Sequence, residues 1–274
     1  MRYPIQAAAI VLALVSTTSQ ASGLNFNTDA CRYDYSTPYD VDVTSAGVSY
    51  HRKDGSPARV LLHDGSLQID GRNVAVSTAD AAALRRYEDG VRRLMPEVAT
   101  VAREAIRLGF SAMSTVTVTF AEGEQRAGII EKLKRKQADA LRDIDAGIGA
   151  GHFSHDAMEE TIGGSVSDTV GELVGSVTSS AVTAALSGDT TRVAALQARA
   201  GSLEKSLDRE MDAQSKTLHA HSDRLCPQLN DLADVQRSWS VRLPDGKPLE
   251  LMTMEPKGTG DRSESSSRHK VVSF

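Results

Sequence analysis

Two histidines and several carboxylates lie close together near the middle of the chain. His152 and His155 are three positions apart, and Asp156 and Glu159 follow them. Imidazole and carboxylate groups are ligands for divalent metal ions, so His152 and His155 are the weak candidates for a metal site. A zinc site usually needs three or four ligands held in fixed positions. The glycines of 147–151 directly precede the histidines, and we expect them to leave the histidines poorly fixed. The pattern therefore favours a solvated loop or a helix cap, with a metal site as the alternative.

A second pair of histidines, His219 and His221, falls in a long predicted helix. Side chains two positions apart on a helix do not face each other, which argues against chelation by this pair. His221 continues an apolar stripe between Leu218 and Leu225. Since buried polar groups are normally hydrogen-bonded, we expect His221 to lie in a core or an interface with a polar partner.

No motif for catalysis or cofactor binding occurs in the sequence. Gly147, Gly149 and Gly151 resemble part of a dinucleotide-binding loop, but the third glycine has the wrong spacing and the segment follows a predicted helix rather than a strand. The sequence also lacks a nucleophile elbow, a P-loop, a zinc-protease helix and a paired-cysteine redox motif. We therefore predict no catalytic residue and no cofactor, although a catalytic triad dispersed along the chain would escape this search.

A basic stretch at residues 85–93 contains four arginines, with Glu88 and Asp89 between them. Opposite charges at helical spacing are typical of a solvent-exposed face with salt bridges, and this is the interpretation we favour. An anionic ligand or a lipid headgroup is the alternative partner for these arginines.

The first 21 residues have the pattern of a cleavable signal peptide. Arg2 supplies a positive charge, residues 7–15 are apolar without interruption, and Ser19-Gln20-Ala21 places small residues where a signal peptidase cuts. A transmembrane helix needs roughly 20 apolar residues, many more than this run provides. We expect cleavage after Ala21 and export to a bacterial periplasm, with no transmembrane segment in the mature chain.

Cys31 and Cys226 are the two cysteines of the chain. Exported proteins fold in an oxidising compartment, where an even number of cysteines favours disulfide formation. We predict a bond between Cys31 and Cys226, with two buried free thiols as the alternative. Such a bond closes a very long loop, which in the chain-entropy model restricts the denatured chain by on the order of 4–5 kcal/mol.

The charge of the chain argues against a nucleic-acid partner. The formal net charge is −5, and removal of a signal peptide that holds one cation and no acid makes it one unit more negative, −6. Nucleic-acid binding depends on clustered lysines and arginines that neutralise phosphates. A mildly acidic protein does not have this excess of cations.

The N-terminal part of the mature chain, residues 31–77, is predicted to form β-structure. Polar and apolar residues alternate over 41–44, and three Asp-Gly pairs begin at Asp54, Asp64 and Asp70. Asp-Gly between apolar runs is a strong hairpin signal because both residues accept positive φ. The pattern indicates a small antiparallel meander.

Residues 78–226 form the predicted helical region. Ser77 resembles a helix N-cap, and Pro96 is expected to end the helix that follows or to start a second one. Residues 115–120 fit either a strand or a helix, and we favour the helix. A flexible joint is expected at 147–151, where glycines interrupt the helical pattern.

The rest of the predicted helical region contains a seam and a long helix. Small residues four positions apart within 157–186 form a seam that permits close helix packing or contact with a membrane surface. The clearest helix spans about 191–224, and Pro227 is expected to end it. A hairpin is predicted at 237–254, placed so that it could pair with the meander, and residues 256–274 are predicted to be a disordered tail.

Several spaced landmarks lie along the chain, namely Cys31, Gly65-Ser66-Leu67, Asp70-Gly71, Val74, Leu84, Tyr87, Arg92, Pro96 and Cys226-Pro227. Taken together, these residues resemble the YggN-like family of uncharacterised bacterial periplasmic proteins. The resemblance spans most of the mature chain. Because that family is a domain of unknown function, it implies periplasmic export but no activity and no catalytic residue.

These elements indicate an α+β fold in which a small antiparallel β-meander and a C-terminal β-hairpin pack with long α-helices. We expect a signal peptide (1–21), a single α+β domain (22–255) and a tail (256–274). The long amphipathic helices and the missing catalytic motifs predict a non-enzymatic binding or scaffolding role in the periplasm. The expected partner is an envelope protein or a second copy of the chain. The alternatives are a metal-assisted hydrolase and a peripheral membrane-surface protein.

Overall fold

The computed structural model describes most of the chain from residue 31 to residue 256. It covers residues 31, 33–121, 123–161 and 190–256, with the isolated helical positions 171, 175, 178, 182 and 186. The predicted signal peptide, the predicted tail after Pro256 and most of the small-residue seam lie outside the described residues.

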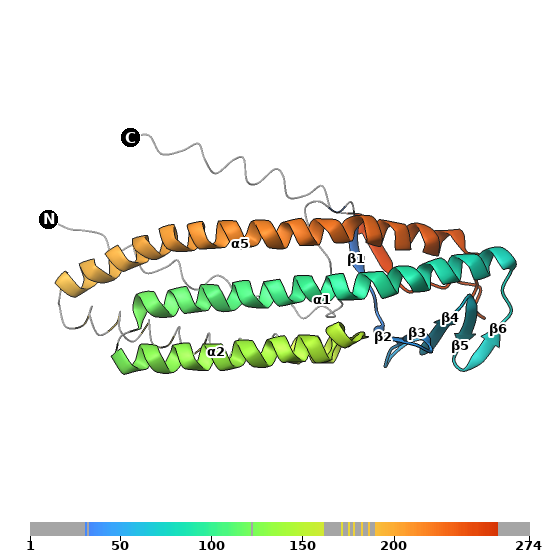
Figure 1. The fold of residues 1–274 in the computed structure, drawn as a ribbon, viewed down its shortest axis with the longest axis horizontal. Coiled ribbons are helices and arrows are strands. Elements are labelled where there is room, and N and C mark those ends of the chain that lie inside the picture. Colours follow the sequence, from blue (N-terminus) through green and yellow to red (C-terminus); the bar gives the residue numbers. More distant parts are fainter. Residues whose placement is uncertain are drawn as a thin grey trace, which may run out of the picture.

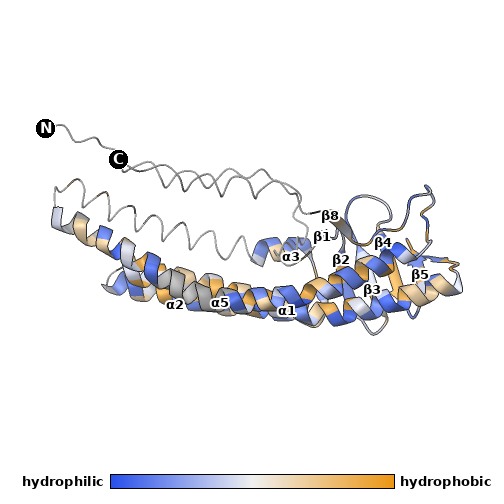
Figure 2. Cartoon of the chain, turned by 90° about the horizontal axis from the view of Figure 1, so that it is seen from above, coloured by the Kyte–Doolittle hydropathy of each residue, from blue (hydrophilic) through white to orange (hydrophobic). Residues whose placement is uncertain are grey.

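Three long helices lie side by side lengthwise, and the β-strands gather at one end of them (Figure 1). The long helices are α1 (Thr78–Phe120), α2 (Gly123–Ala146) and α5 (Thr190–Ser238), and the short ones are η1 (Ile148–Ala150) and α3 (His155–Glu159). Hydrophobic and hydrophilic residues alternate around the long helices (Figure 2), as expected for helices that bury one face. No helix among the described residues is long and apolar enough to cross a membrane. The predicted α+β fold class is confirmed.

The strands form two antiparallel sheets. The larger sheet has the order β6-β5-β4-β3-β2-β7, and the smaller sheet pairs β1 with β8. The bounds are β1 (Tyr33–Ser36), β2 (Asp40–Thr44), β3 (Gly47–His51), β4 (Arg59–His63), β5 (Ser66–Ile69), β6 (Arg72–Val74), β7 (His152–Phe153) and β8 (Thr253–Pro256).

The predicted meander is present as β2 to β6, and Asp-Gly turns connect its later strands. At the β4–β5 turn, Asp64 and Gly65 have φ of 46° and 78°. Asp70 and Gly71 repeat this pair of positive φ values, 48° and 77°, between β5 and β6. Two consecutive residues with positive φ match the twist of antiparallel strands, which explains why this dipeptide predicted the hairpins.

One face of the larger sheet packs on the first half of α1. Alternate residues of β2 to β5 are buried, among them Val48, Val60 and Leu62, which are fully inaccessible to solvent. They join a core with Leu84 and Tyr87 of α1. The apolar residues at every second strand position therefore pack against the apolar stripe of α1 in one hydrophobic layer.

The start of α1 is fixed by a cap that also holds the C-terminal segment. As predicted, Ser77 caps the helix, since its hydroxyl accepts a hydrogen bond from the backbone N–H of Asp80 at 3.0 Å. The carboxylate of Asp80 accepts from the backbone N–H and the hydroxyl of Ser240, at 2.7 and 2.9 Å. Asp80 is buried, and these bonds lower the pKa of its carboxyl, with the Ser240 backbone N–H contributing most.

Both prolines that were expected to interrupt helices lie inside them. Pro96 is within α1, and Pro227 is within α5, which continues to Ser238. A proline inside a helix costs about 3 kcal/mol, but each of these two is flanked by buried core residues. The predictions that these helices end at the prolines were wrong because packing of the whole apolar stripe outweighs the local cost.

Residues 115–120 complete α1, as we favoured. The β-branched residues here suit a strand, but the hydroxyls of Thr115, Thr117 and Thr119 each donate to the carbonyl oxygen four positions earlier, at 3.1, 2.8 and 2.8 Å. Such bonds let threonine satisfy its hydroxyl within a helix. The alternation of threonine and valine is therefore compatible with the helix.

The predicted C-terminal hairpin is a tight turn with a single bridge, between Arg242 and Pro248. Backbone bonds from Leu243 N–H to the Lys247 carbonyl and from Leu249 N–H to the Val241 carbonyl close it, at 2.8 and 3.1 Å. The C-terminal strand that does pair is β8, and it pairs with β1 rather than with the meander. Both ends of the described chain therefore meet, but in a separate sheet.

The molecule divides into a head and an arm. The head comprises the described residues of 31–99, 144–161 and 221–256, which include both sheets, and it contains the buried residues of the larger cluster. The arm comprises residues 100–120 of α1, 123–143 of α2 and 190–220 of α5, and it extends away from the sheets (Figure 1). Among the described residues, the arm has a smaller buried cluster around Phe110, Ile129 and Leu133.

Candidate functional site

The glycines at 147–151 form a hydrogen-bonded turn that attaches β7 to the edge of the sheet. Gly147 N–H donates to the Asp143 carbonyl at 2.8 Å, and its own carbonyl accepts from His152 N–H at 2.9 Å. Gly151 has φ of 93°, and a Cβ there would lie 2.8 Å from the Val43 carbonyl oxygen. Where we predicted a flexible joint, the structure has this hydrogen-bonded turn, in which glycine provides positive φ and a close backbone approach.

The strand register brings two aspartates and two histidines to the outer edge of the sheet. Asp40 of β2 is opposite His51 of β3, and Asp42 of β2 is opposite His152 of β7. Residues directly opposite in an antiparallel pair project from the same face. The alternation of β2 therefore puts both carboxylates beside imidazole rings while Val41 is buried in the core.

These side chains are close enough to interact as ion pairs. His152 Nδ1 lies 2.8 Å from Asp42 Oδ1, and His51 Nδ1 lies 3.4 Å from Asp42 Oδ2. His51 Nε2 also lies 3.7 Å from Asp40 Oδ2. The rings of His152 and His51 are half exposed, so solvent screens these pairs and each contributes little by itself.

His155 is the most enclosed histidine of the group. It begins α3 directly after the cap residue Ser154, and both its backbone N–H and its Nδ1 contact Asp40 Oδ1, at 2.9 and 2.7 Å. Its Nε2 lies 3.0 Å from the carbonyl oxygen of Thr37. The ring therefore lies between the carboxylate of Asp40 and the backbone carbonyl of Thr37.

We call Asp40, Asp42, His51, His152 and His155 the His–Asp cluster. Burial raises the pKa of Asp40, but the hydrogen bonds from the His155 backbone and ring and the nearby imidazoles outweigh it, so the pKa of Asp40 is lowered overall. The carboxylate form is thus the one that the cluster stabilises. A further ion pair joins Lys53, just after β3, to Asp156 of α3.

The cluster is arranged to hold segments together rather than to hold a metal ion. Among the described residues, no group of three or more His, Cys, Asp or Glu side chains could hold a metal ion. The two metal candidates, His152 and His155, are brought to the same edge, but each directs Nδ1 to a different aspartate. The His–Asp contacts attach β7 and α3 to β2 by electrostatic attraction.

Sequence reasoning missed Asp40, Asp42 and His51. The signal for the aspartates is the alternation in β2, which places Asp40 and Asp42 on one face of a strand. The pairing of Asp42 with His152 joins positions 110 apart. No local pattern encodes that contact, because it depends on where the glycine turn returns the chain.

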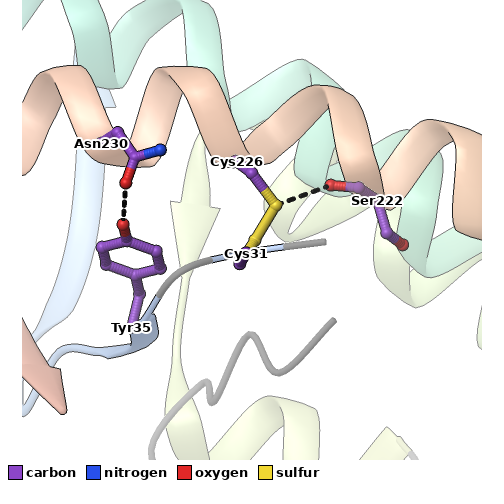
Figure 3. Close-up of a disulfide and its surroundings, with 5 residues drawn as sticks. All are labelled: Cys31, Tyr35, Ser222, Cys226 and Asn230. Carbon is purple, nitrogen blue, oxygen red and sulfur yellow. Dashed lines mark hydrogen bonds between the residues drawn. A yellow bond between two sulfur atoms is a disulfide. The ribbon is translucent and has the colours of Figure 1, made fainter. Parts of the chain in front are cut away.

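The predicted disulfide joins Cys31 to Cys226, with 5.2 Å between the two Cα atoms. Figure 3 shows Tyr35 beside the bond, where its hydroxyl donates to Asn230 Oδ1. Cys226 and Asn230 are four positions apart and so lie on one face of α5. The disulfide and the Tyr35–Asn230 hydrogen bond therefore attach the N-terminal segment to α5 (Figure 3).

The remaining predicted polar residues lie in helix contacts. His221 is partly buried between α5 and α1, and its Nδ1 lies 2.6 Å from Glu104 Oε1. The geometry of this contact is not that of the hydrogen bond that we expected. His219 is exposed.

The arginines of 85–93 pair partly within α1 and partly beyond it. Arg92 contacts Glu88 at 2.7 Å, within α1. Arg85 contacts Asp64 at 2.8 Å, in the β4–β5 turn. The favoured salt-bridged face is therefore present, and it also ties α1 to the sheet.

Comparison with known proteins gives a family but no described activity. Neither the curated proteins nor the solved structures contain a match to this chain. One family, described as "Protein of unknown function (DUF2884)", matches residues 34–252. This range includes both the His–Asp cluster and the sheet, and the chain belongs to that family.

Proposed function

We propose that the protein is exported to the bacterial periplasm and acts there in a non-enzymatic binding or scaffolding role. The signal-peptide pattern of residues 1–21 supports export. The Cys31–Cys226 disulfide supports an oxidising compartment, since such bonds rarely persist in the cytosol. The resemblance to YggN-like periplasmic proteins points to the same compartment.

The observation that carries the binding role is the division into head and arm. The head is closed by the disulfide and holds most of the buried residues, so it is the stable part. The arm projects from it as long helices (Figure 1), with exposed side chains such as Lys134 and Ala138 of α2. A projecting helical surface offers the extended contact area that a stable protein interface requires, about 800 Å² on each partner.

The His–Asp cluster supports a non-enzymatic role. Its aspartates are paired with histidines of the same cluster, which leaves the metal-assisted hydrolase without a preformed set of ligands in the described part of the chain. A structural use of the cluster explains its contacts. We therefore propose that the arm carries the binding surface and that the His–Asp cluster stabilises the head.

Photo-crosslinking in intact cells tests the proposal. A photoreactive amino acid is placed at Lys134 or Ala138 in the arm and, as the matched control, at Asn73 in β6. All three positions are exposed, so none should disturb the core. We expect discrete adducts from the arm positions and none from Asn73, with the adduct mass distinguishing a second copy of the chain from another envelope protein.

Two outcomes would contradict the proposal. The first is no adduct from either arm position while the protein is present in the periplasmic fraction. The second is equal adduct formation from the arm and from Asn73, which would indicate random collision. Metal analysis of the purified protein, with His152→Ala as the control, tests the hydrolase alternative separately.

A further inference from the structure

A polar groove lies between α1 and α5 in the head. The two helices run side by side in opposite directions (Figure 1). Gly90 of α1 lies directly against Leu232 of α5, since a Cβ on Gly90 would lie 2.7 Å from Leu232 Cδ2, and both residues line the groove. The volume of the groove is about 530 Å³, within the range of about 300–1,000 Å³ that is usual for small-molecule sites.

Two of the four arginines at 85–93 line this groove. Arg85 and Arg92 pair with acids elsewhere, whereas Arg86 and Arg93 lie in the groove wall and form no ion pair with any residue that the structure describes. Arg86 and Arg93 are seven positions apart, so they lie on one face of α1, about 10 Å apart along its axis. Their guanidinium groups are therefore available to an anionic group of a ligand.

Carboxylates line the same groove. Asp231 and Asp234 come from α5, and Asp89 comes from α1. Asp234 is already paired with Arg237, whereas Asp89 and Asp231 form no ion pair within the described part of the chain. These carboxylates would repel a ligand that carries only negative charge, and the arginines would repel one that carries only positive charge.

The unpaired charges alternate in sign along the groove. Asp89 and Asp231 each directly precede one of the two residues in contact, so both carboxylates belong to the middle of the groove. Arg86 and Arg93 are three and four positions from Asp89, on either side of it. Residues at this spacing on a helix have Cβ atoms about 5–6 Å apart. A ligand that contacts both signs therefore needs a cation and an anion a few ångströms apart.

We infer that this groove binds a small zwitterion with an ammonium group and a carboxylate, as in a free amino acid or a short peptide. The ammonium group lies between the carboxylates of Asp89 and Asp231. The ligand carboxylate accepts from the guanidinium group of Arg86 or Arg93, which permits two parallel hydrogen bonds. Val235 in the groove wall offers apolar surface to a ligand side chain. This inference does not depend on the proposed role of the arm.

Calorimetric titration of the purified full chain with the dipeptide leucylleucine tests the inference. The N-acetyl derivative of the dipeptide lacks the ammonium charge, and its C-terminal amide lacks the carboxylate. We expect saturable binding of the dipeptide and binding of each derivative that is weaker by roughly 10-fold or more, because each derivative loses a hydrogen bond between charged groups.

Two double variants separate the two charges of the site. Arg86→Gln with Arg93→Gln should bind the dipeptide no more tightly than the wild type binds the amide. Asp89→Asn with Asp231→Asn should bind it no more tightly than the wild type binds the N-acetyl derivative. The matched control removes two exposed arginines of α2, at positions 135 and 142, by the same change to glutamine, and it should leave the affinity unchanged.

The inference is overturned if leucylleucine does not bind saturably, which would make the groove a solvated surface only. It is equally overturned if either derivative binds as tightly as the dipeptide, or if either double variant in the groove retains the affinity of the wild type. The four substituted groove residues are exposed, so we expect the variants to fold. A melting curve for each variant distinguishes loss of binding by unfolding from loss of the site.

Discussion

At the scale of single residues, the contacts of Asp40 explain how the β7–α3 segment stays on the sheet. One carboxylate oxygen accepts from the backbone and the ring of His155, and the other faces His51. Removal of the Asp40 carboxylate would therefore leave the backbone N–H and the ring of His155 without this acceptor. Loss of one partner from such a network costs about 1–3 kcal/mol.

We predict that Asp40→Asn lowers the free energy of unfolding by about 1–3 kcal/mol at neutral pH. The folded pKa of Asp40 lies below its ordinary value of 3.8, so its contribution is complete above about pH 4 and is lost as the pH falls through the folded pKa. The difference between wild type and variant should therefore shrink in acid. Urea denaturation between pH 7 and pH 2.5 measures this difference, with exposed Asp54→Asn as the control. A difference that stays constant throughout this pH range would contradict the role of the carboxylate.

At the scale of elements, α1 runs unbroken through a residue that normally stops helices. Val91, Met95, Val98 and Ala99 are all buried in the head core on either side of Pro96. The burial of these residues requires one continuous helix with one continuous apolar stripe. The helix therefore tolerates the missing N–H and the steric conflict that proline introduces.

We predict that Pro96→Ala raises the free energy of unfolding by about 1–3 kcal/mol, because alanine restores the hydrogen bond and removes the conflict. Part of the gain is offset, since the unfolded chain becomes more flexible without proline. Glu97→Ala, at the adjacent exposed position, controls for helix propensity. Chemical denaturation that found Pro96→Ala less stable than the wild type would show that the proline marks a helix boundary.

Patterns that depend on neighbouring residues predicted the elements well. The Asp-Gly turns, the Ser77 cap and the helical stripes are local, so sequence alone located the meander and most of the helices. The helix ends at Pro96 and Pro227 were wrong, because the cost of proline is local while the burial that offsets it is tertiary. The His–Asp cluster escaped prediction for the same reason, since Asp42 meets His152 only through strand pairing.

At the scale of the whole molecule, the disulfide determines which ends of the chain are held together. Cys31 precedes β1, and Cys226 lies within α5, so the bond spans 195 positions. Next to it, Tyr35 bonds to Asn230, and β1 pairs with β8. The head is therefore assembled from the two ends of the described chain, while the arm between them is held by helix packing.

We predict that Cys226→Ser lowers the free energy of unfolding by about 2–5 kcal/mol under oxidising conditions, because the unfolded chain is no longer closed into a long loop. Chemical denaturation of the variant and of the wild type measures the loss. Wild type treated with a reductant is the control and should show a similar loss. A variant that unfolds at the same denaturant concentration as the oxidised wild type would show that the bond contributes nothing to the head.

We propose that the chain is exported and then closed by this bond, and the intact mass of the protein from a periplasmic extract tests both points. We expect a mass that lacks residues 1–21 and is two hydrogen atoms lighter than the reduced mature chain. Treatment with a reductant should restore the two hydrogens. A full-length mass, or a mature mass with both thiols free in the freshly isolated protein, would contradict the account.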